Sequence, residues 1–219
     1  MKPDYERAAL LAAEMLIKHR ITNAPVIPLP IFKRTPGCLV LSFTEMSGRI
    51  GIERDRLVAS FDSESHDAVT SVHYEDGQLR YLVAYNQRLP FYLLQRALAR
   101  ELGHIVLGHD GSRPEDVRMA EAHAFAAHFL CPRPLVHAIQ QSGIPFTVEI
   151  LGAMTGCYER CLQNMRKIPA VHVPPSLNRQ IRDQFSDYIK NFLDFETYLS
   201  QSDETMLVNF GSFMDGYKE

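Results

Sequence analysis

Long apolar runs, secretory signals and paired-cysteine motifs are all missing from this sequence of 219 residues. No stretch approaches the ~20 consecutive apolar residues that a membrane-spanning helix needs. Residues 1–7 lead directly into an amphipathic segment, so we expect no signal peptide. The four cysteines form no C-x-x-C pair, and reduced thiols are the simplest interpretation. The sequence therefore predicts a cytoplasmic protein without a membrane segment.

A basic overall charge is missing as well. The formal net charge is −3, so no general electrostatic field attracts nucleic acid, and direct nucleic-acid binding is not expected. Hydrophobic residues make up 46% and charged residues 22% of the chain, which is ordinary for a globular protein. A chain of this length suits one domain with a small appendage and can bury a substantial core.

The N-terminal half shows signals for one helix and a small sheet. Apolar residues at helical spacing predict a helix over residues 4–20. Two β-rich runs, residues 68–74 and 79–86, flank an Asp-Gly turn and predict a β-hairpin. The remaining predictions are an extended, proline-rich connector over 24–36, a buried strand over 38–43, and loop with at most a short helical turn over 48–66.

The C-terminal half is predicted to be helical. Pro90 opens a helix that runs to about Leu107, and Gly108 is a natural stop because glycine readily adopts the left-handed conformation. Residues 112–115 resemble a capping box that starts a second helix through Leu130. Further helices are predicted over 133–142, over 147–167 as two short helices with a helix-turn-helix-like outline, and over 176–199.

Residues 100–104 nearly match a zinc-protease motif. The motif H-E-x-x-H places two histidines at i and i+4 on one helical face, with a glutamate beside them as general base. Glu101 and His104 are present, but Arg100 stands where the first histidine should be. Arginine cannot ligate a metal, because its guanidinium stays protonated and offers only donors. Gly103 lies inside the same helix at a cost of ~1 kcal/mol relative to alanine, which close approach of another backbone would explain.

Glu121 begins a mostly small and apolar stretch of the second helix. Glu101 likewise shares the apolar arc of its own helix. A carboxylate on the inner side of a helix needs a partner, since unpaired buried charge is costly. In zinc proteases of the His-Glu-His type the third ligand is a glutamate from a following helix, and Glu121 lies at a plausible distance along the chain for that role.

Three segments resemble the ImmA/IrrE family of metallopeptidases: Tyr-Asn at 85–86, residues 99–109, and E-A-x-x-F-A-A-x-x-L-C-P at 121–132. Family members usually show A-H-E-L-G-H and E-A-x-x-F-A-x-x-L-L-M-P in this order. The likeness is specific over about 80–135 and weaker over 5–80. It implies an α+β fold, with a zincin-like, gluzincin-type helical core and a small antiparallel sheet over residues 1–135. A C-terminal helical extension, 136–219, is expected to pack on this domain.

The resemblance also implies site residues and partners. His104 and Glu121 would be zinc ligands, and Glu101 would be the general base. Proteins of this family are commonly encoded beside a repressor that they cleave or inactivate. The expected partner is therefore a protein or peptide, such as a helix-turn-helix repressor.

Arg100 departs from the family pattern and leaves three interpretations open. In the first, a bidentate Arg100–Glu121 ion pair, which Glu101 can share, replaces the metal. Zinc is then absent or weakly bound, and the protein is a non-catalytic or strongly impaired metallopeptidase homologue that acts as a regulatory protein-binding module. In the second, a water or a displaced residue completes the site of an active zinc endopeptidase that cleaves a repressor. In the third, Arg100 points to solvent and only the fold is shared.

Three other histidines bear on the second interpretation. His109 is a possible auxiliary ligand, but it lies beyond the expected helix end and its direction is open. His123 faces about 200° away from Glu121 on a helical wheel. His128 shares the face of Glu121 but lies ~10 Å along the axis, too far for one metal.

Overall fold

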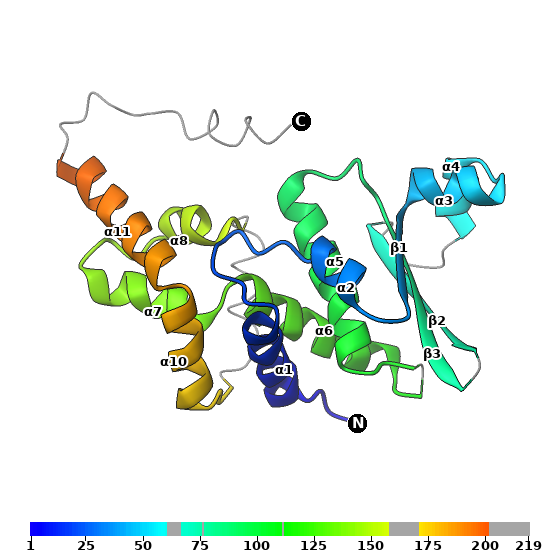
Figure 1. Ribbon diagram of the computed structural model, residues 1–219, viewed down its shortest axis with the longest axis horizontal. Coiled ribbons are helices and arrows are strands. Elements are labelled where there is room, and N and C mark those ends of the chain that lie inside the picture. Colours follow the sequence, from blue (N-terminus) through cyan, green and yellow to red (C-terminus); the bar gives the residue numbers. More distant parts are fainter. Residues whose placement is uncertain (61–66, 76, 111, 158–170, 202–219) are drawn as a thin grey trace.

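The computed structural model describes residues 1–60, 67–75, 77–110, 112–157 and 171–201 (Figure 1). The described residues form helices and one small sheet, which lies at one end of the molecule in Figure 1, so the α+β class predicted from the sequence is confirmed. In chain order the elements are α1 (Tyr5–Lys18), α2 (Leu29–Arg34), β1 (Cys38–Ser42), α3 (Phe43–Ile50), α4 (Arg54–Ser60), β2 (Ala68–Glu75), β3 (Gln78–Tyr85), α5 (Phe91–Val106), α6 (Glu115–Leu130), α7 (Arg133–Ser142), α8 (Val148–Thr155), α10 (Pro175–Gln184) and α11 (Ser186–Gln201).

The centre of the fold is the pair of helices α5 and α6, which pack against each other, with α1 packed on α6 (Figure 1). Both helices match their predicted ranges closely. α5 ends at Val106, and Gly108, two residues later, adopts the left-handed conformation with φ 68°. The stacked rings of Phe125 and Phe129 are fully buried in the core beside Leu98 and Leu102 of α5. This packing fixes the spacing between the two helices that carry the motif residues.

The sheet has the strand order β1-β3-β2. β2 and β3 form the predicted antiparallel hairpin, whereas β1 pairs with β3 in parallel, so the sheet is mixed and not purely antiparallel. The chain leaves β1 through α3 and α4 and returns with β2 at the far edge, so β3 is the strand that lies beside β1. α5 contacts β2 and β3, and this contact brings the sheet next to the motif helix.

Several local predictions were wrong for identifiable reasons. Residues 29–34 form helix α2 and not an extended connector, since Pro30 lies in its first turn, where proline is tolerated. Over 48–66, where loop with at most a short helical turn was predicted, the structure has the end of α3 and the whole of α4. Ser42 and Glu45 form a capping box that starts α3. The capping box predicted at residues 112–115 is not formed, because α6 begins only at Glu115 after Pro114.

The C-terminal part also differs from its prediction. The single helix expected over 176–199 is divided at the buried residue Phe185 into α10 and α11. Of the two short helices expected over 147–167, α8 is present, and the second lies outside the described residues. α10 packs on α1 and on α7, and one hydrophobic core includes residues from both sides of position 135. The domain boundary at 135/136 stays a prediction. None of the described helices is long and apolar enough to cross a membrane.

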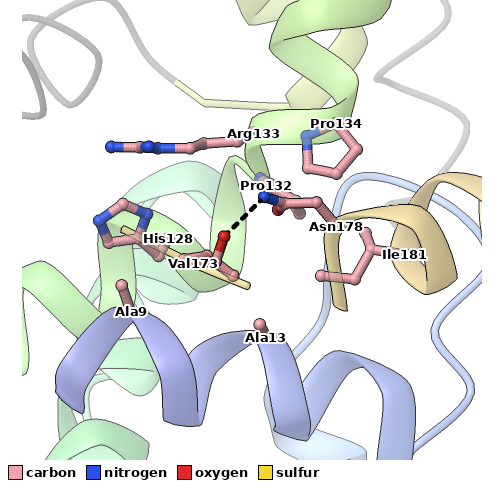
Figure 2. Close-up of a pocket in the computed structure, with 9 residues that line it drawn as sticks. All are labelled: Ala9, Ala13, His128, Pro132, Arg133, Pro134, Val173, Asn178 and Ile181. Carbon is pink, nitrogen blue, oxygen red and sulfur yellow. Dashed lines mark hydrogen bonds between the residues drawn. The ribbon is translucent and has the colours of Figure 1, made fainter. Parts of the chain in front are cut away.

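A small cavity of ≈ 10 Å³ lies between α1, the α6–α7 junction and α10 (Figure 2). That volume has room for about one water molecule. The imidazole of His128 lines it, and its buried Nε2 has no hydrogen-bond partner among the described residues. Burial, and then the positive charge of Arg133, lower the pKa of His128 to about 4. The ring is therefore neutral in the folded protein over most of the acidic range.

His128 should make the folded protein sensitive to acid. Between pH 6.5 and about pH 4 the unfolded chain binds a proton that folded His128 does not, so the free energy of unfolding falls as pH drops through this window. His128→Gln removes the titrating group, and we expect its free energy of unfolding, from urea titrations, to fall less steeply over the same window. A variant with the wild-type pH dependence would contradict a neutral, buried His128.

Gly103 is required by close packing of α5 on α6. A Cβ at this position would lie 3.2 Å from the backbone oxygen of Ala122 and 3.1 Å from Cδ1 of Phe125. This confirms the close approach inferred from a glycine inside the helix.

The substitution Gly103→Ala should therefore destabilise the protein. We expect its free energy of unfolding to fall by about 1–2 kcal/mol, because overpacking outweighs the gain in helix propensity. Gly48→Ala in α3 is the matched control, since its Cβ would meet nothing within 4 Å. The control should be neutral or more stable by up to ~1 kcal/mol in chemical denaturation. Equal effects of the two substitutions would contradict the packing argument.

Candidate functional site

Arg100 and Glu101 form a buried ion pair at the position of the zinc-protease motif. Arg100 is 5% exposed and Glu101 3% exposed. Nε and Nη2 of Arg100 both lie 3.0 Å from Oε1 of Glu101, and Nη2 also donates to the carbonyl oxygen of Ala68 at 3.2 Å. The hydroxyl of Thr70 donates to Oε2 of Glu101 at 2.8 Å. Both carboxylate oxygens of Glu101 are thus engaged.

The electrostatic balance at Glu101 depends on Arg100. Burial raises the pKa of Glu101 above its usual value, while the charge of Arg100 and the hydrogen bond from Thr70 act in the opposite direction. Arg100 is the cation that compensates this carboxylate inside the core. It does not point to solvent, so the third interpretation is wrong about the direction of Arg100.

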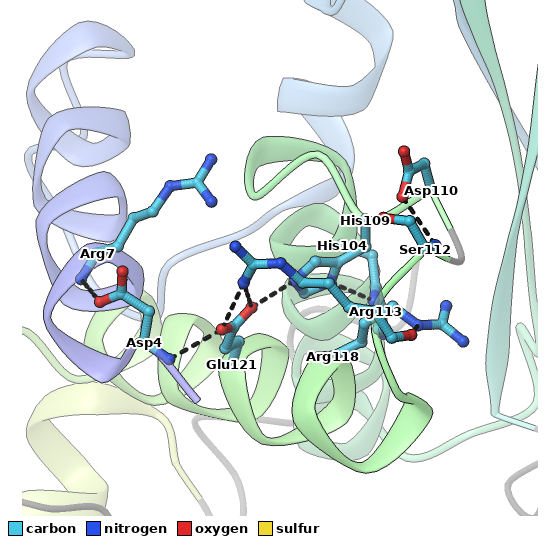
Figure 3. A network of polar contacts seen from close by, with 9 residues as sticks. All are labelled: Asp4, Arg7, His104, His109, Asp110, Ser112, Arg113, Arg118 and Glu121. Carbon is cyan, nitrogen blue, oxygen red and sulfur yellow. Dashed lines mark hydrogen bonds and ion pairs between the residues drawn. The ribbon is translucent and has the colours of Figure 1, made fainter. Parts of the chain in front are cut away.

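The predicted ion pair between Arg100 and Glu121 is not formed. Arg100 extends toward β2, where it meets the backbone of Ala68. Glu121, on α6, instead contacts the N-terminal segment and the connection between α5 and α6 (Figure 3). Its cation is Arg113, whose Nη1 lies 2.8 Å from Oε1 and 3.1 Å from Oε2. A tethered cation does neutralise Glu121, but it comes from a different residue.

Glu121 is fully buried and accepts four hydrogen bonds. Two come from Arg113; the backbone N–H of Asp4 donates to Oε1 at 2.8 Å, and Nε2 of His109 lies 2.9 Å from Oε2. Burial acts to raise the pKa of Glu121, but the hydrogen bonds from Asp4 and His109 and the charge of Arg113 outweigh it and lower the pKa. The carboxylate is therefore ionised at neutral pH.

His109 lies between His104 and Glu121, which settles the direction that the sequence left open. The Nδ1 atoms of His104 and His109 are 2.8 Å apart. Burial and the neighbouring charges lower the pKa of His104 to about 3, and burial lowers that of His109, so both rings are neutral at pH 7. An ionised carboxylate only accepts hydrogen bonds. Nε2 of His109 therefore donates to Glu121, and its Nδ1 accepts from Nδ1 of His104.

This arrangement does not fit a zinc ion with three protein ligands. Arg100 puts a cation at one ligand position, and the acceptor sites of Glu121 are all engaged. Across the described ranges, no group of three or more His, Cys, Asp or Glu side chains is placed to hold a metal ion. Of the other histidines, His123 is exposed and His128 lines the separate cavity of Figure 2.

Three contacts of the site were not found from the sequence. Thr70 lies in the predicted hairpin, so the sequence placed it on a strand. The sequence did not show that its side chain lies on the face of the sheet next to α5. Arg113 lies only eight residues before Glu121, and an arginine in a short connection between two site helices is a usable signal. The backbone N–H of Asp4 carries no sequence signal, since every residue except proline has one.

Removal of the Glu121 carboxylate should destabilise the whole protein. Glu121→Ala leaves the buried ring of His109, the half-buried guanidinium of Arg113 and the backbone N–H of Asp4 without this acceptor. We expect the free energy of unfolding to fall by about 3–5 kcal/mol. The control Glu14→Ala changes an exposed glutamate of α1 and should stay within ~0.5 kcal/mol of wild type. Urea denaturation at neutral pH measures both. A loss for Glu121→Ala no larger than that of the control would contradict the described network.

Part of the chain resembles a known protein family. The family model described as the IrrE N-terminal-like domain, a peptidase family, matches residues 58–152. This range contains β2, β3, α5 and α6, and therefore Arg100, Glu101, His104 and Glu121. No curated protein and no solved structure matches the chain. Residues 58–152, somewhat less than half of the chain, therefore form a metallopeptidase-like domain similar to that of the ImmA/IrrE family.

Proposed function

We propose that the protein is a non-catalytic or strongly impaired metallopeptidase homologue that acts as a regulatory protein-binding module. The observation that carries this proposal is the buried Arg100–Glu101 pair. It puts a permanent cation at a ligand position and engages the residue that would act as general base.

Two physical effects support the loss of peptidase activity. A general base needs a free carboxylate oxygen within reach of the proton it removes. In Glu101, Oε1 is bound by Arg100 and Oε2 by Thr70. A guanidinium at the ligand position also repels a divalent cation, and the repulsion is stronger in a buried site than in water. Peptidase activity would require rearrangement of both groups.

The family relationship supports a protein partner. Proteins of the ImmA/IrrE family are commonly encoded beside a repressor that they cleave or inactivate. From the resemblance to this family, we propose that the partner is a protein of the helix-turn-helix repressor class. The zincin-like fold would then bind this partner without cleaving it. We place the protein in the cytoplasm; the thiol of Cys38 is free, which agrees with a reducing compartment.

The alternative is an active zinc endopeptidase that cleaves such a repressor. The observation that favours it is the adjacency of His104, His109 and Glu121, which are joined by contacts of 2.8 and 2.9 Å. The presence of His109 next to two family ligand positions offers a replacement for the missing histidine. It would have to give up its hydrogen bond to His104 or Glu121 to do so.

Zinc analysis of the native protein separates the two functions. We expect protein purified without chelator to contain far less than one zinc per chain. When it is mixed with a repressor encoded beside it, we expect the two proteins to form a complex in which the repressor is not cleaved. Glu101→Gln removes the counter-ion of Arg100 and should lower the stability of the protein. In the fraction that remains folded, zinc content and the integrity of the bound repressor should be unchanged, because no proton transfer depends on Glu101. Stoichiometric zinc, or chelator-sensitive cleavage that Glu101→Gln abolishes, would establish the alternative.

A further inference from the structure

We infer that metal is excluded at two separate positions, with Arg113 as a second built-in obstacle beside Arg100. This inference rests on the proposed loss of zinc binding and concerns a residue outside the zinc-protease motif. Arg113 forms an ion pair with Glu121, the ligand that the second helix would contribute. Arg100 forms an ion pair with Glu101 and itself occupies the ligand position before Glu101. The two arginines share no carboxylate.

The acceptor capacity of Glu121 is fully used. An ionised carboxylate has two oxygens and about four lone-pair sites. Oε1 accepts from Asp4 N–H and Arg113, and Oε2 accepts from His109 and Arg113. A metal ion that binds this carboxylate must displace one of these donors. The free energy lost when the metal binds depends on which of these donors the metal displaces.

Arg113 is the donor that competes most directly with a cation. Its Nη1 spans both oxygens of Glu121, at 2.8 and 3.1 Å, and so lies on the carboxylate edge that a cation would approach. It is also the only one of the three donors that carries a full charge. Its side chain is 33% exposed, whereas His109 and Glu121 are buried. Arg113 therefore closes Glu121 from the solvent side.

The position of Arg113 is fixed by local structure. It precedes Pro114, which caps the start of α6, and its carbonyl oxygen accepts a hydrogen bond from Nε of Arg118 at 3.2 Å. Figure 3 shows the guanidinium of Arg113 directed at Glu121 from this loop. The contact is thus built into the connection between α5 and α6.

One consequence is that restoring the missing histidine alone should not restore a strong zinc site. Arg100→His removes the first cation, but Arg113 still holds Glu121. The double variant Arg100→His/Arg113→Met removes both cations and keeps side-chain length at position 113. We expect it to bind Zn²⁺ about tenfold or more tightly than Arg100→His alone, since a hydrogen bond to a charged group no longer has to be broken.

The experiment measures Zn²⁺ affinity by chelator competition, and Co²⁺ absorption spectra as a signature of ligand geometry, on the full chain. The control is Arg100→His/Arg7→Met, which removes an exposed charge of α1 drawn near the same network in Figure 3. We expect the control to match Arg100→His. If Arg113→Met impairs folding, Arg100→His/Arg113→Gln removes the charge with a polar side chain and should still bind Zn²⁺ more tightly than Arg100→His.

The outcomes separate this inference from the proposed function. Stoichiometric Zn²⁺ in the wild-type protein overturns the proposed function. Equal Zn²⁺ affinity of Arg100→His and both Arg113 double variants, including no binding by any of them, overturns the role of Arg113 and leaves the proposed function standing. An equal gain in the Arg7 control also overturns it, because the effect would then be one of general charge.

Discussion

The arrangement of the site depends on one buried carboxylate, that of Glu121. Four hydrogen bonds from two segments meet on it: one from the N-terminal segment through Asp4, and three from the α5–α6 connection through His109 and Arg113. Together with α6, which carries Glu121, three segments are joined here. Because a buried charge must be compensated, the ends of these segments are held where they are. Hydrogen bonds to Glu121 hold three parts of the chain together, as a bound metal ion would do through its ligands. Here all the groups involved belong to the protein.

The two carboxylates of the zincin-like site are each compensated by a different arginine. Arg100 serves Glu101 and Arg113 serves Glu121. Buried ion pairs often add little net stability, because desolvation offsets their attraction, but a buried charge without its partner is strongly destabilising. The arginines thus supply from within the chain the positive charge that each of the two carboxylates needs. Packing also contributes to the stability of the fold. That packing includes the contact of Gly103 with the backbone of α6 and with Phe125.

Sequence reasoning succeeded where the signal was local. The hairpin, the ranges of α5 and α6 and the need for glycine at 103 follow from turn chemistry, periodicity and propensity, and the structure confirms them. It failed where tertiary contacts decided the outcome. The parallel pairing of β1 with β3 depends on the path of the chain through α3 and α4. The partner of Arg100 depends on the rotation of α5 against the sheet, which periodicity does not specify.

The sequence by itself determined that Arg100, at the position of the first histidine of the zinc-protease motif, is not a metal ligand, whereas Glu101 and His104 match the motif. Residue chemistry alone makes that conclusion firm, since a guanidinium cannot ligate a metal. Only the tertiary structure decided which cation meets which carboxylate. An ion pair depends on distances of about 3 Å between atoms that are far apart in the chain, and these distances are set when α1, the α5–α6 connection and β2 pack around the helix pair.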